Sequence, residues 1–376
     1  MASSKTALVV GSGIVGLALT RSLVERGWTV TMLERHPQAQ GASVRNFGML
    51  WPVGQPEGPL YKRAMRSREI WLELQGKAGF WAEKTGSLHL TYTDLEAQIA
   101  QEYVRAVQGV KSAAWIGPVE VAEKSPAAVQ KGLRGALWSA DEVIVDPPEA
   151  IAAVAAYLER LPTVNFVRNR VVGRIEGNTA YSGREQWSAD RIFVASGADF
   201  ETLYPEVFAQ TAITKCKLQM MRLVSQPDAW RIGPPLCSSL SFIHYKGFDV
   251  APSLPKLRAL YHEQSPELLQ WGIHVMVSQN GSGELVIGDS HEYGLNLAPF
   301  DQQFINDLIV DFLKSFAQFR DWRIGASWHG IYPKMTNGAT EYIHPVDDVT
   351  TVVNGVGGAG MTLSFGLAEE VVGGMG

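Results

Sequence analysis

Cysteine is scarce in this sequence of 376 residues, which contains only Cys216 and Cys237. Two cysteines allow one disulfide at most. The start of the chain also lacks the basic segment and the long apolar segment of a secretory signal. We therefore predict a cytoplasmic, reduced protein in which both thiols are buried and inert.

Long hydrophobic runs are missing as well. Runs such as residues 7–10 and 151–158 are much shorter than the ~18 residues that a membrane-spanning helix needs. Lysine and arginine number 33 against 38 acidic residues, so the net charge is -5 and no overall positive field would attract nucleic acid or an anionic membrane. We predict no transmembrane segment and no nucleic-acid partner, and any anion site must be local.

The composition that remains is that of a globular protein. Hydrophobic residues make up 46%, charged residues 19%, and there are 11 tryptophans, which excludes extended disorder. At ~150 residues per domain, this length predicts about two to three domains.

Residues 7–34 have the pattern of a β-α-β unit. Residues 7–10 form a short apolar run typical of a buried parallel strand, residues 17–26 have helical character, and residues 29–33 form a second strand. The turn after the first strand reads Gly11-Ser-Gly-Ile-Val-Gly16.

Each glycine of that turn has its own expected role. Gly11 permits the tight turn, Gly13 lets a pyrophosphate approach the backbone, and Gly16 lets the helix and strand pack closely. The helix N-terminus would face the phosphates. Glu34 follows Gly16 by 18 residues, where a carboxylate can accept hydrogen bonds from an adenosine ribose. We predict dinucleotide binding, with an ordinary glycine-rich turn as the alternative.

Two later segments also combine a strand with small residues. Residues 188–198 contain a strand that ends in Ala195-Ser-Gly197, and residues 350–372 contain a strand, a glycine loop and a helix. Ligands of open α/β sheets bind at the carboxyl ends of strands, and a glycine loop can aim a helix N-terminus at them. We predict that the first and last segments hold the two ends of one large cofactor. A routine strand and turn would also explain residues 188–198.

The stretches between these segments read as a second domain. Runs at 87–92, 216–224 and 273–277 resemble antiparallel strands, and an amphipathic helix is expected over 304–319. The predicted fold class is α/β, or α+β for the whole chain. A Rossmann-like domain would comprise residues 1–81, 146–210 and 321–376, and a mainly antiparallel substrate domain would comprise residues 82–145 and 211–320.

Several motifs together resemble the D-amino-acid oxidase superfamily of FAD enzymes, in its glycine oxidase and sarcosine oxidase branch. They are the Gly11–Gly16 turn, Leu33-Glu34-Arg35, Gly41-Ala-Ser-Val-Arg-Asn-Phe-Gly48, Val194-Ala-Ser-Gly197, Trp328-His-Gly330 with Pro333, and residues 355–362. They follow the family order over essentially the whole chain. Residues 42–48 with Gly54-Gln55, Ala64, residues 66–68 and Trp71 are more narrowly similar to FAD oxidoreductases associated with phosphonate catabolism.

The resemblance implies a flavin that accepts a hydride from a carbon bearing an amine. The imine then hydrolyses to a carbonyl compound, and in an oxidase oxygen is reduced to hydrogen peroxide. The helix start at residues 357–362 would stabilise negative charge on the reduced flavin. The implied FAD contacts are Gly11, Ser12, Gly13, Ile14, Val15, Gly16, Glu34, Arg35, Ser43, Arg45, Asn46, Gly48, Val171, Ala195, Ser196, Gly197, Gly330, Gly357, Gly358, Gly360, Met361 and Thr362.

The sequence departs from the family pattern at four positions. Amino-acid oxidases of the superfamily grip the substrate carboxylate with an arginine, and Tyr332 stands at that position, which disfavours a plain α-amino acid. Ile331 stands where sarcosine oxidases attach FAD to a cysteine, which predicts non-covalent FAD. Val286 and Thr362 stand where those enzymes have lysines for the oxygen reaction and for substrate binding, so the acceptor, oxygen or another, stays open.

The remaining candidates are weighed against structural alternatives. We predict Tyr332, Arg45, His291 and Trp328 as catalytic and Gln55, His244, Tyr245, Lys246 and Tyr332 as substrate-binding. The alternative for Arg45 is a surface turn, and the alternative for His291 is a strand-end turn. Trp328 could instead serve ordinary aromatic packing, and residues 244–246 could form a solvated hairpin. His274 is interpreted as a core histidine. For a phosphonate dianion the cationic candidates are Arg45, Lys246, Arg222 and Lys334. We predict no metal site.

The sequence therefore predicts an FAD-dependent oxidoreductase that oxidises the C–N bond of a small primary or secondary amine. An aminophosphonate or its N-methyl form fits this description, and a D-amino acid or glycine is an alternative. A dehydrogenase that passes electrons to a quinone or a protein is another alternative, and a flavin-binding module without turnover is the third.

Overall fold

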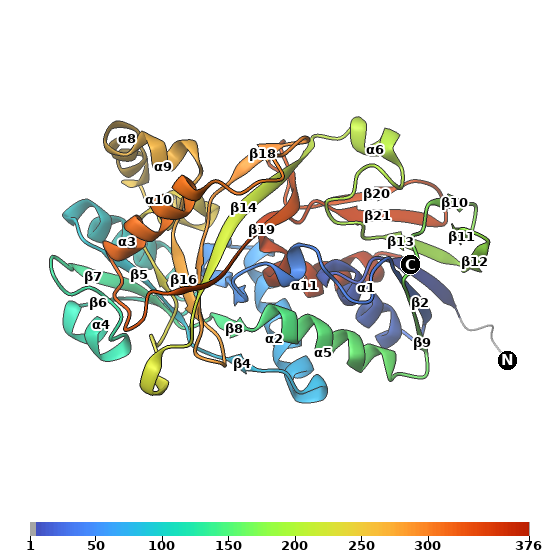
Figure 1. Cartoon of the computed structure of the whole chain (residues 1–376), viewed down its shortest axis with the longest axis horizontal. Helices are drawn as coiled ribbons and strands as arrows, with labels where there is room; N and C mark the ends of the chain where they lie inside the picture. Colours follow the sequence, from blue (N-terminus) through green and yellow to red (C-terminus); the bar gives the residue numbers. More distant parts are fainter. Residues whose placement is uncertain (1–4, 376) are drawn as a thin grey trace.

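The computed structural model describes residues 5–375, so the expectation about the first four residues of the chain lies outside it. Two large β-sheets follow one another along the long axis of the molecule (Figure 1). Within residues 5–375, no helix is both long and apolar enough to cross a membrane. Cys216 and Cys237 are free and buried, as predicted.

Six strands form the first sheet, in the order β20 (Tyr342–Pro345), β21 (Thr350–Asn354), β13 (Arg191–Val194), β1 (Thr6–Val10), β2 (Thr29–Glu34) and β9 (Val164–Arg168). All neighbours are parallel except β20 and β21. The strands predicted at 7–10, 29–33 and 350–354 are confirmed. Helix α1 (Ile14–Glu25) begins earlier than the predicted residue 17 because Gly13 already serves as its N-cap.

Different elements cover the two faces of this sheet, because successive side chains of a strand point to opposite sides. Ala7 and Val9 on β1 pack with the helices α1, α2 (Pro59–Ala78), α5 (Pro147–Glu159) and α11 (Gly360–Gly373). Leu8 points to the other face, which is covered by the sheet β10 (Arg174–Glu176), β11 (Thr179–Ser182) and β12 (Glu185–Ser188) and by α6 (Pro205–Ala209).

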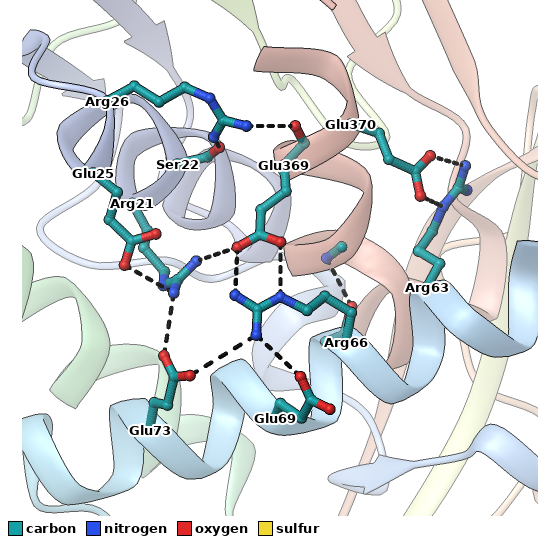
Figure 2. Close-up of polar contacts among 12 residues, drawn as sticks. Arg21, Ser22, Glu25, Arg26, Arg63, Arg66, Glu69, Glu73, Glu369 and Glu370 are labelled. Atoms are coloured by element: carbon teal, nitrogen blue, oxygen red, sulfur yellow. Dashed lines mark hydrogen bonds and ion pairs between the residues drawn. The ribbon is translucent and has the colours of Figure 1, made fainter. Parts of the chain in front are cut away.

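Local signals set the ends of these helices. Pro59 is the first residue of α2, and Gly79 follows its last residue with φ +79°. The side chain of Asp146 accepts a hydrogen bond from the amide of Glu149 and caps α5. Ion pairs then join the helices, since Arg66 on α2 contacts Glu369 on α11 at 2.8 Å (Figure 2).

Nine strands form the second sheet. Their order is β18 (Glu292–Gly294), β14 (Ile213–Leu223), β17 (Leu285–Gly288), β16 (Met276–Gln279), β15 (Leu236–Cys237), β5 (Ser87–Thr91), β7 (Gly135–Ser139) and β6 (Ala113–Ile116), with β19 (Ile324–Met335) paired to β14. Only β15 and β5 are parallel neighbours, so the predicted antiparallel character is confirmed. The helices on this side are α3 (Asp94–Ala106), α4 (Pro118–Lys124), α7 (Leu240–His244), α8 (Leu254–Gln264), α9 (Pro266–Gln270) and α10 (Gln303–Lys314) (Figure 1). A fourth sheet is formed by β3 (Met49–Leu50), β8 (Val143–Val145) and β4 (Ala82–Glu83).

Two predicted boundaries in this region are wrong. The strand expected over 273–277 begins only at Met276. The helix expected over 304–319 ends at Lys314, because residues 316–318 pair instead with a loop: Val129 N donates to Phe316 O, and Gln318 N donates to Ala127 O.

The long strand β19 lies in the second sheet. It pairs with β14 from Ile324 to Met335, although the predicted division assigns residues 321–376 to the Rossmann-like domain. Near its end, Lys334 forms an isolated bridge with Val356. This strand therefore carries Tyr332 up to the C-terminal glycine loop, while the division into domains stays a prediction.

Candidate active site

A cavity of about 550 Å³ is lined by residues of both large sheets. At one end its wall is formed by the β1–α1 turn and the ends of β2 and β13. At the other end it is formed by Tyr332, Lys334 and His244. The cavity thus lies at the carboxyl ends of the parallel strands, where ligands of such sheets bind.

The β1–α1 turn requires glycine at two positions. Gly11 has φ +101°, and a Cβ there would lie 2.4 Å from the carbonyl oxygen of Ala195. A Cβ on Gly16 would lie 1.9 Å from the carbonyl oxygen of Gly11. These contacts bring the start of α1 close to the ends of β1 and β13.

Helix α1 presents its positive end to the cavity. Gly13 caps it without a side chain, and its first turn contains no acidic residue. Ile14 N donates to the hydroxyl of Ser43 at 2.9 Å, which attaches the loop of residues 41–48 to the turn. A Cβ on Gly13 would lie 3.1 Å from that hydroxyl oxygen, so there is little room for a side chain at this position.

The carboxylate of Glu34 contacts the β1–α1 turn and the segment that follows β2. One of its carboxylate oxygens accepts hydrogen bonds from both the amide and the hydroxyl of Ser12 at 2.8 Å, and the other accepts from the amide of His36. Glu34 lines the cavity, whereas Ser12 does not. The carboxylate therefore holds the β1–α1 turn in place and also faces the cavity.

The C-terminal glycine loop closes the opposite side. Gly355 and Gly357 have φ +71° and +60°, and α11 starts at Gly360 with no acidic residue in its first turn. A Cβ on Gly358 would lie 3.3 Å from the hydroxyl oxygen of Tyr332. The positive ends of α1 and α11 therefore both face the cavity, as expected for two segments that hold one ligand.

The loop of residues 41–48 is held by its own side chains. Asn46 Nδ2 donates to Ala42 O and Ser43 O, and Asn46 Oδ1 accepts from Gly48 N. Arg45 Nη1 donates to His329 O at 3.2 Å. Trp328 Nε1 donates to Arg45 O at 3.4 Å, so Trp328 supports this loop from outside the cavity.

Tyr332 is a buried phenol at the far end, and the residue is 7% exposed. Burial raises its pKa well above the ordinary value for tyrosine, so the hydroxyl stays protonated and can donate a hydrogen bond. Burial likewise raises the pKa of Tyr245. Tyr332 thus offers the cavity an uncharged hydrogen-bond donor.

Most of the predicted site residues line the cavity. Five do not: Ser12 contacts Glu34, Gly16 packs on Gly11, Gly48 packs on Val145 O, Val171 is half exposed beside the lining residues Arg170 and Val172, and Trp328 supports Arg45. The lining ones are Gly11, Gly13, Ile14, Val15, Glu34, Arg35, Ser43, Arg45, Asn46, Gln55, Ala195, Ser196, Gly197, His244, Tyr245, Lys246, His291, Gly330, Tyr332, Gly357, Gly358, Gly360, Met361 and Thr362.

Many lining residues lie outside the predicted site set, and three of them with ionisable side chains are His274, Asp289 and Lys334. His274 lines the cavity although its sequence pattern indicated a core histidine, and Asp289 was not singled out. Lys334 also lines it, whereas Arg222 lies outside and pairs with Glu284 at 3.2 Å. The strands that bring these residues together are far apart in sequence, so no local pattern marks them as one site.

Residues 6–373 match the protein family described as DAO, FAD dependent oxidoreductase. The chain belongs to this family. It is therefore an FAD-dependent oxidoreductase, and the predicted resemblance is confirmed.

Curated relatives of this DAO-family protein include the tRNA 5-methylaminomethyl-2-thiouridine biosynthesis bifunctional protein MnmC of Pseudomonas aeruginosa strain PAO1. The two are 28% identical over 300 residues, which cover 72% of this chain and 43% of the relative. The match therefore spans less than half the length of that protein.

Solved structures of the same fold extend over almost the whole chain. Glycine oxidase from Geobacillus kaustophilus is 19% identical with a TM-score of 0.74, and covers 98% of this chain and 94% of its own. L-Proline dehydrogenase from P. horikoshii is 20% identical with a TM-score of 0.73, covering 100% and 95%. L-alpha-Glycerophosphate oxidase from Mycoplasma pneumoniae, solved with FAD bound, is 17% identical with a TM-score of 0.73, covering 98% and 94%. The predicted fold class is thus confirmed.

The cavity of this DAO-family protein fits FAD. Backbone without side chains is exposed at Gly11, Gly13 and Gly358, where a Cβ would meet neighbouring atoms, and two helix N-termini without acidic residues supply N–H groups for phosphate and ring oxygens. When bound, FAD supplies the hydride acceptor, and the protein supplies position and charge.

Proposed function

We propose that this protein oxidises the C–N bond of a small amine that carries an anionic group, such as an aminophosphonate or its N-methyl derivative, with FAD held non-covalently. The observation that carries this proposal is a set of three cationic side chains in the cavity wall. Arg45, Lys246 and Lys334 make no ion pair with a carboxylate within residues 5–375; their polar partners are neutral.

The partners of these cations leave their charge available. Arg45 donates to a backbone carbonyl, Lys246 Nζ donates to Gly338 O at 3.1 Å, and Lys334 Nζ donates to the hydroxyl of Tyr293 at 2.9 Å. Two other lining cations, Arg35 and Arg170, are paired with carboxylates. In a protein of net charge -5, three unpaired cations at one cavity favour an anionic ligand there.

The position of Tyr332 indicates where the anionic group of the substrate would not bind. At the position where amino-acid oxidases of the family hold an α-carboxylate with arginine, this chain offers one hydroxyl donor and no charge. The charged group of the substrate would therefore be one that the three cations reach, rather than an α-carboxylate at Tyr332. A phosphonate on an amine fits this requirement because its dianion takes several donors.

The names of several relatives support an amine as the donor. Glycine oxidase and L-proline dehydrogenase are named for amino acids, and the curated relative is named for a methylaminomethyl group. L-alpha-Glycerophosphate oxidase is not named for an amine, so the fold also serves other donors. Two of these structural relatives are named oxidases and one a dehydrogenase, which leaves the electron acceptor of this protein open. Dehydrogenation with transfer to a quinone or protein is the second candidate for the acceptor step.

An anaerobic amine panel tests the proposal. Aminophosphonates, their N-methyl forms, glycine and D-amino acids are mixed with the FAD-loaded protein, and flavin absorbance is recorded. We expect bleaching by an aminophosphonate, and none by the matching hydroxyphosphonate that lacks the amine. Absence of bleaching by every amine contradicts the proposal. Air is then admitted and hydrogen peroxide is measured, because its formation distinguishes an oxidase from a dehydrogenase.

A variant comparison tests the anion site itself. Lys334→Met should raise the amine concentration for half-maximal bleaching by at least about tenfold, because a charge-assisted hydrogen bond contributes roughly 1.5–3 kcal/mol. The matched control is Lys314→Met, which removes an exposed lysine on α10 that is not part of the cavity lining. Equal values for the two variants contradict a role for Lys334.

A further inference from the structure

Three histidines from separate elements meet at the cavity wall. His244 ends α7, His274 precedes β16 and His291 precedes β18. One potential ligand nitrogen of each lies within 4.8 Å of the other two. The ring centroid of His244 lies 3.6 Å from that of His274 and 4.9 Å from that of His291.

Asp289 adds a carboxylate to this group. Its Oδ1 lies 3.3 Å from His274 Nε2 and 4.0 Å from His291 Nδ1, and its side chain is 6% exposed. All four residues line the cavity. Three imidazoles and one carboxylate are a ligand set that suits Zn²⁺ and similar divalent transition metals.

Two buried atoms in the group have no hydrogen-bond partner within residues 5–375. They are Nδ1 of His274 and Oδ1 of Asp289, whose residues are 3% and 4% exposed. A buried polar atom without a partner costs roughly 1–3 kcal/mol, so this arrangement is unfavourable unless a ligand satisfies it. A hydrophobic neighbour could not do so, whereas a cation can.

His291 has the orientation expected of a metal ligand. Its Nδ1 lies 2.8 Å from the carbonyl oxygen of Gly272. With the proton on Nδ1, this hydrogen bond fixes the ring and leaves Nε2 as the free electron-pair donor. Backbone carbonyls commonly hold ligand histidines in this way.

The protonation of the histidines suits ligation. Burial lowers the pKa of His291 to about 4 and the pKa values of His244 and His274 well below the ordinary value. The three rings are therefore neutral near pH 7, which is the form that binds metals, whereas burial raises the pKa of Asp289, whose proton a bound cation would displace. His244 is the most accessible of the three, which leaves one side of the group open to the cavity.

We propose that His244, His274, His291 and Asp289 bind one divalent transition-metal cation, with Zn²⁺ as the representative ion. The nitrogens of a tetrahedral zinc site lie about 3.3 Å apart, so the ligand nitrogens, now within 4.8 Å of one another, would draw together by at most about 1.5 Å on binding. An open coordination position would face the cavity and hold an oxygen of the anionic substrate group. That last role rests on the proposed function; the binding of the metal does not.

Metal binding to the FAD-loaded protein tests this directly. The protein is treated with a chelator and titrated with Zn²⁺ against a chromophoric competitor, and metal content is measured after desalting. We expect one Zn²⁺ per chain, with affinity reduced at least tenfold in His291→Gln and in Asp289→Asn. His344→Gln, which changes a partly buried histidine on β20 outside the cavity lining, should bind as the unchanged protein does. No binding at micromolar Zn²⁺, or equal binding by all variants, overturns the proposal.

Co²⁺ gives an independent readout. In a tetrahedral site with nitrogen ligands it absorbs at wavelengths beyond the flavin bands, and we expect this absorption to be lost in His274→Gln. Retained flavin absorbance and circular dichroism show that the variant is folded, and His291→Gln serves as a second variant if it is not. A Co²⁺ spectrum that His274→Gln and His291→Gln leave unchanged contradicts the site. Neither readout needs turnover, so failure of the metal site is distinguishable from failure of amine oxidation.

Discussion

Arg21 on α1 and Glu369 on α11 form an ion pair at 3.2 Å that joins the first and last helices of the described chain (Figure 2). The side chain of Arg21 is only 5% exposed, and it also contacts Glu25 at 2.8 Å and Glu73 at 3.3 Å. Burial alone would raise the pKa of Glu369, but hydrogen bonds from Arg66 and Arg21 hold it below its ordinary value. The two helices whose N-termini face the cavity are thus tied together near their far ends.

Glu369→Gln should destabilise the protein, because Arg21 stays buried with less compensating charge. We expect the free energy of unfolding to fall by about 1–3 kcal/mol, less than for an isolated buried pair because Glu25 and Glu73 remain. Chemical denaturation measures it. Asp311→Asn, which breaks an exposed pair with Lys314, should change stability by roughly 0–0.5 kcal/mol, and an equal effect of both changes contradicts the argument.

Much of the cofactor side could be predicted from the sequence because its signals are local. Gly11 and Gly16 are glycines since backbone oxygens occupy the space of a Cβ, and this requirement is met within one β-α turn. The uninterrupted apolar run of Ala7, Leu8 and Val9 likewise indicates a strand covered on both faces. Such features depend on neighbouring residues and are therefore visible in a single sequence.

The opposite end of the cavity could not be predicted in the same way. His274 and Asp289 meet only because β16 and β17 pair in the second sheet, and no spacing in the sequence indicates that contact. Trp328 was expected in the active site from its motif, but β19 places its ring behind Arg45. Glu34 has the predicted position, yet its contact with Ser12 depends on how the turn closes.

Gly13→Val should abolish the yellow colour of the purified protein. Even a Cβ would lie 3.1 Å from Ser43 Oγ, which is itself held by Ile14 N, and the larger side chain would project into the cavity beside α1. We expect FAD affinity to fall by more than tenfold, equivalent to at least about 1.4 kcal/mol. Titration of the apoprotein with FAD measures it.

The control for that change is Gly76→Ala on α2, where a Cβ would meet nothing within 4 Å. It should leave FAD binding intact and stabilise the protein by roughly 0.5–1 kcal/mol, because glycine destabilises a helix interior relative to alanine. A Gly13→Val protein that keeps its flavin absorbance would refute the assignment of the turn.

Tyr332→Phe should weaken substrate capture more than it weakens flavin retention. The change removes one hydrogen-bond donor and keeps the buried ring beside Gly358. A neutral hydrogen bond contributes about 0.5–1.5 kcal/mol, so we expect KM to rise by roughly 2- to 10-fold with little change in FAD affinity. Equal losses in both would indicate that the hydroxyl serves the cofactor site instead.

Glu142 gives the protein a specific dependence of stability on pH. This residue is fully buried, and its carboxyl accepts hydrogen bonds from Val53 N and Ser87 Oγ, each at 3.0 Å. Burial outweighs these bonds and raises its pKa from 4.5 to about 7. The loop that it holds leads to Gln55 in the cavity wall.

The folded protein keeps this proton over a range in which the unfolded chain releases it. The contribution of Glu142 to stability is therefore most favourable below about pH 4.5 and declines as the pH rises to about 7, by up to about 1.4 kcal/mol per pH unit. Glu142→Gln removes this titration, since the amide resembles the protonated acid. We expect the variant to gain stability relative to the unchanged protein across that window and to keep a constant difference above it. Denaturant unfolding at a series of pH values measures this, with the exposed Glu123→Gln as control. Curves for Glu142→Gln and the unchanged protein that run parallel from pH 4.5 to 7 would show that the carboxyl titrates alike in the folded and unfolded states.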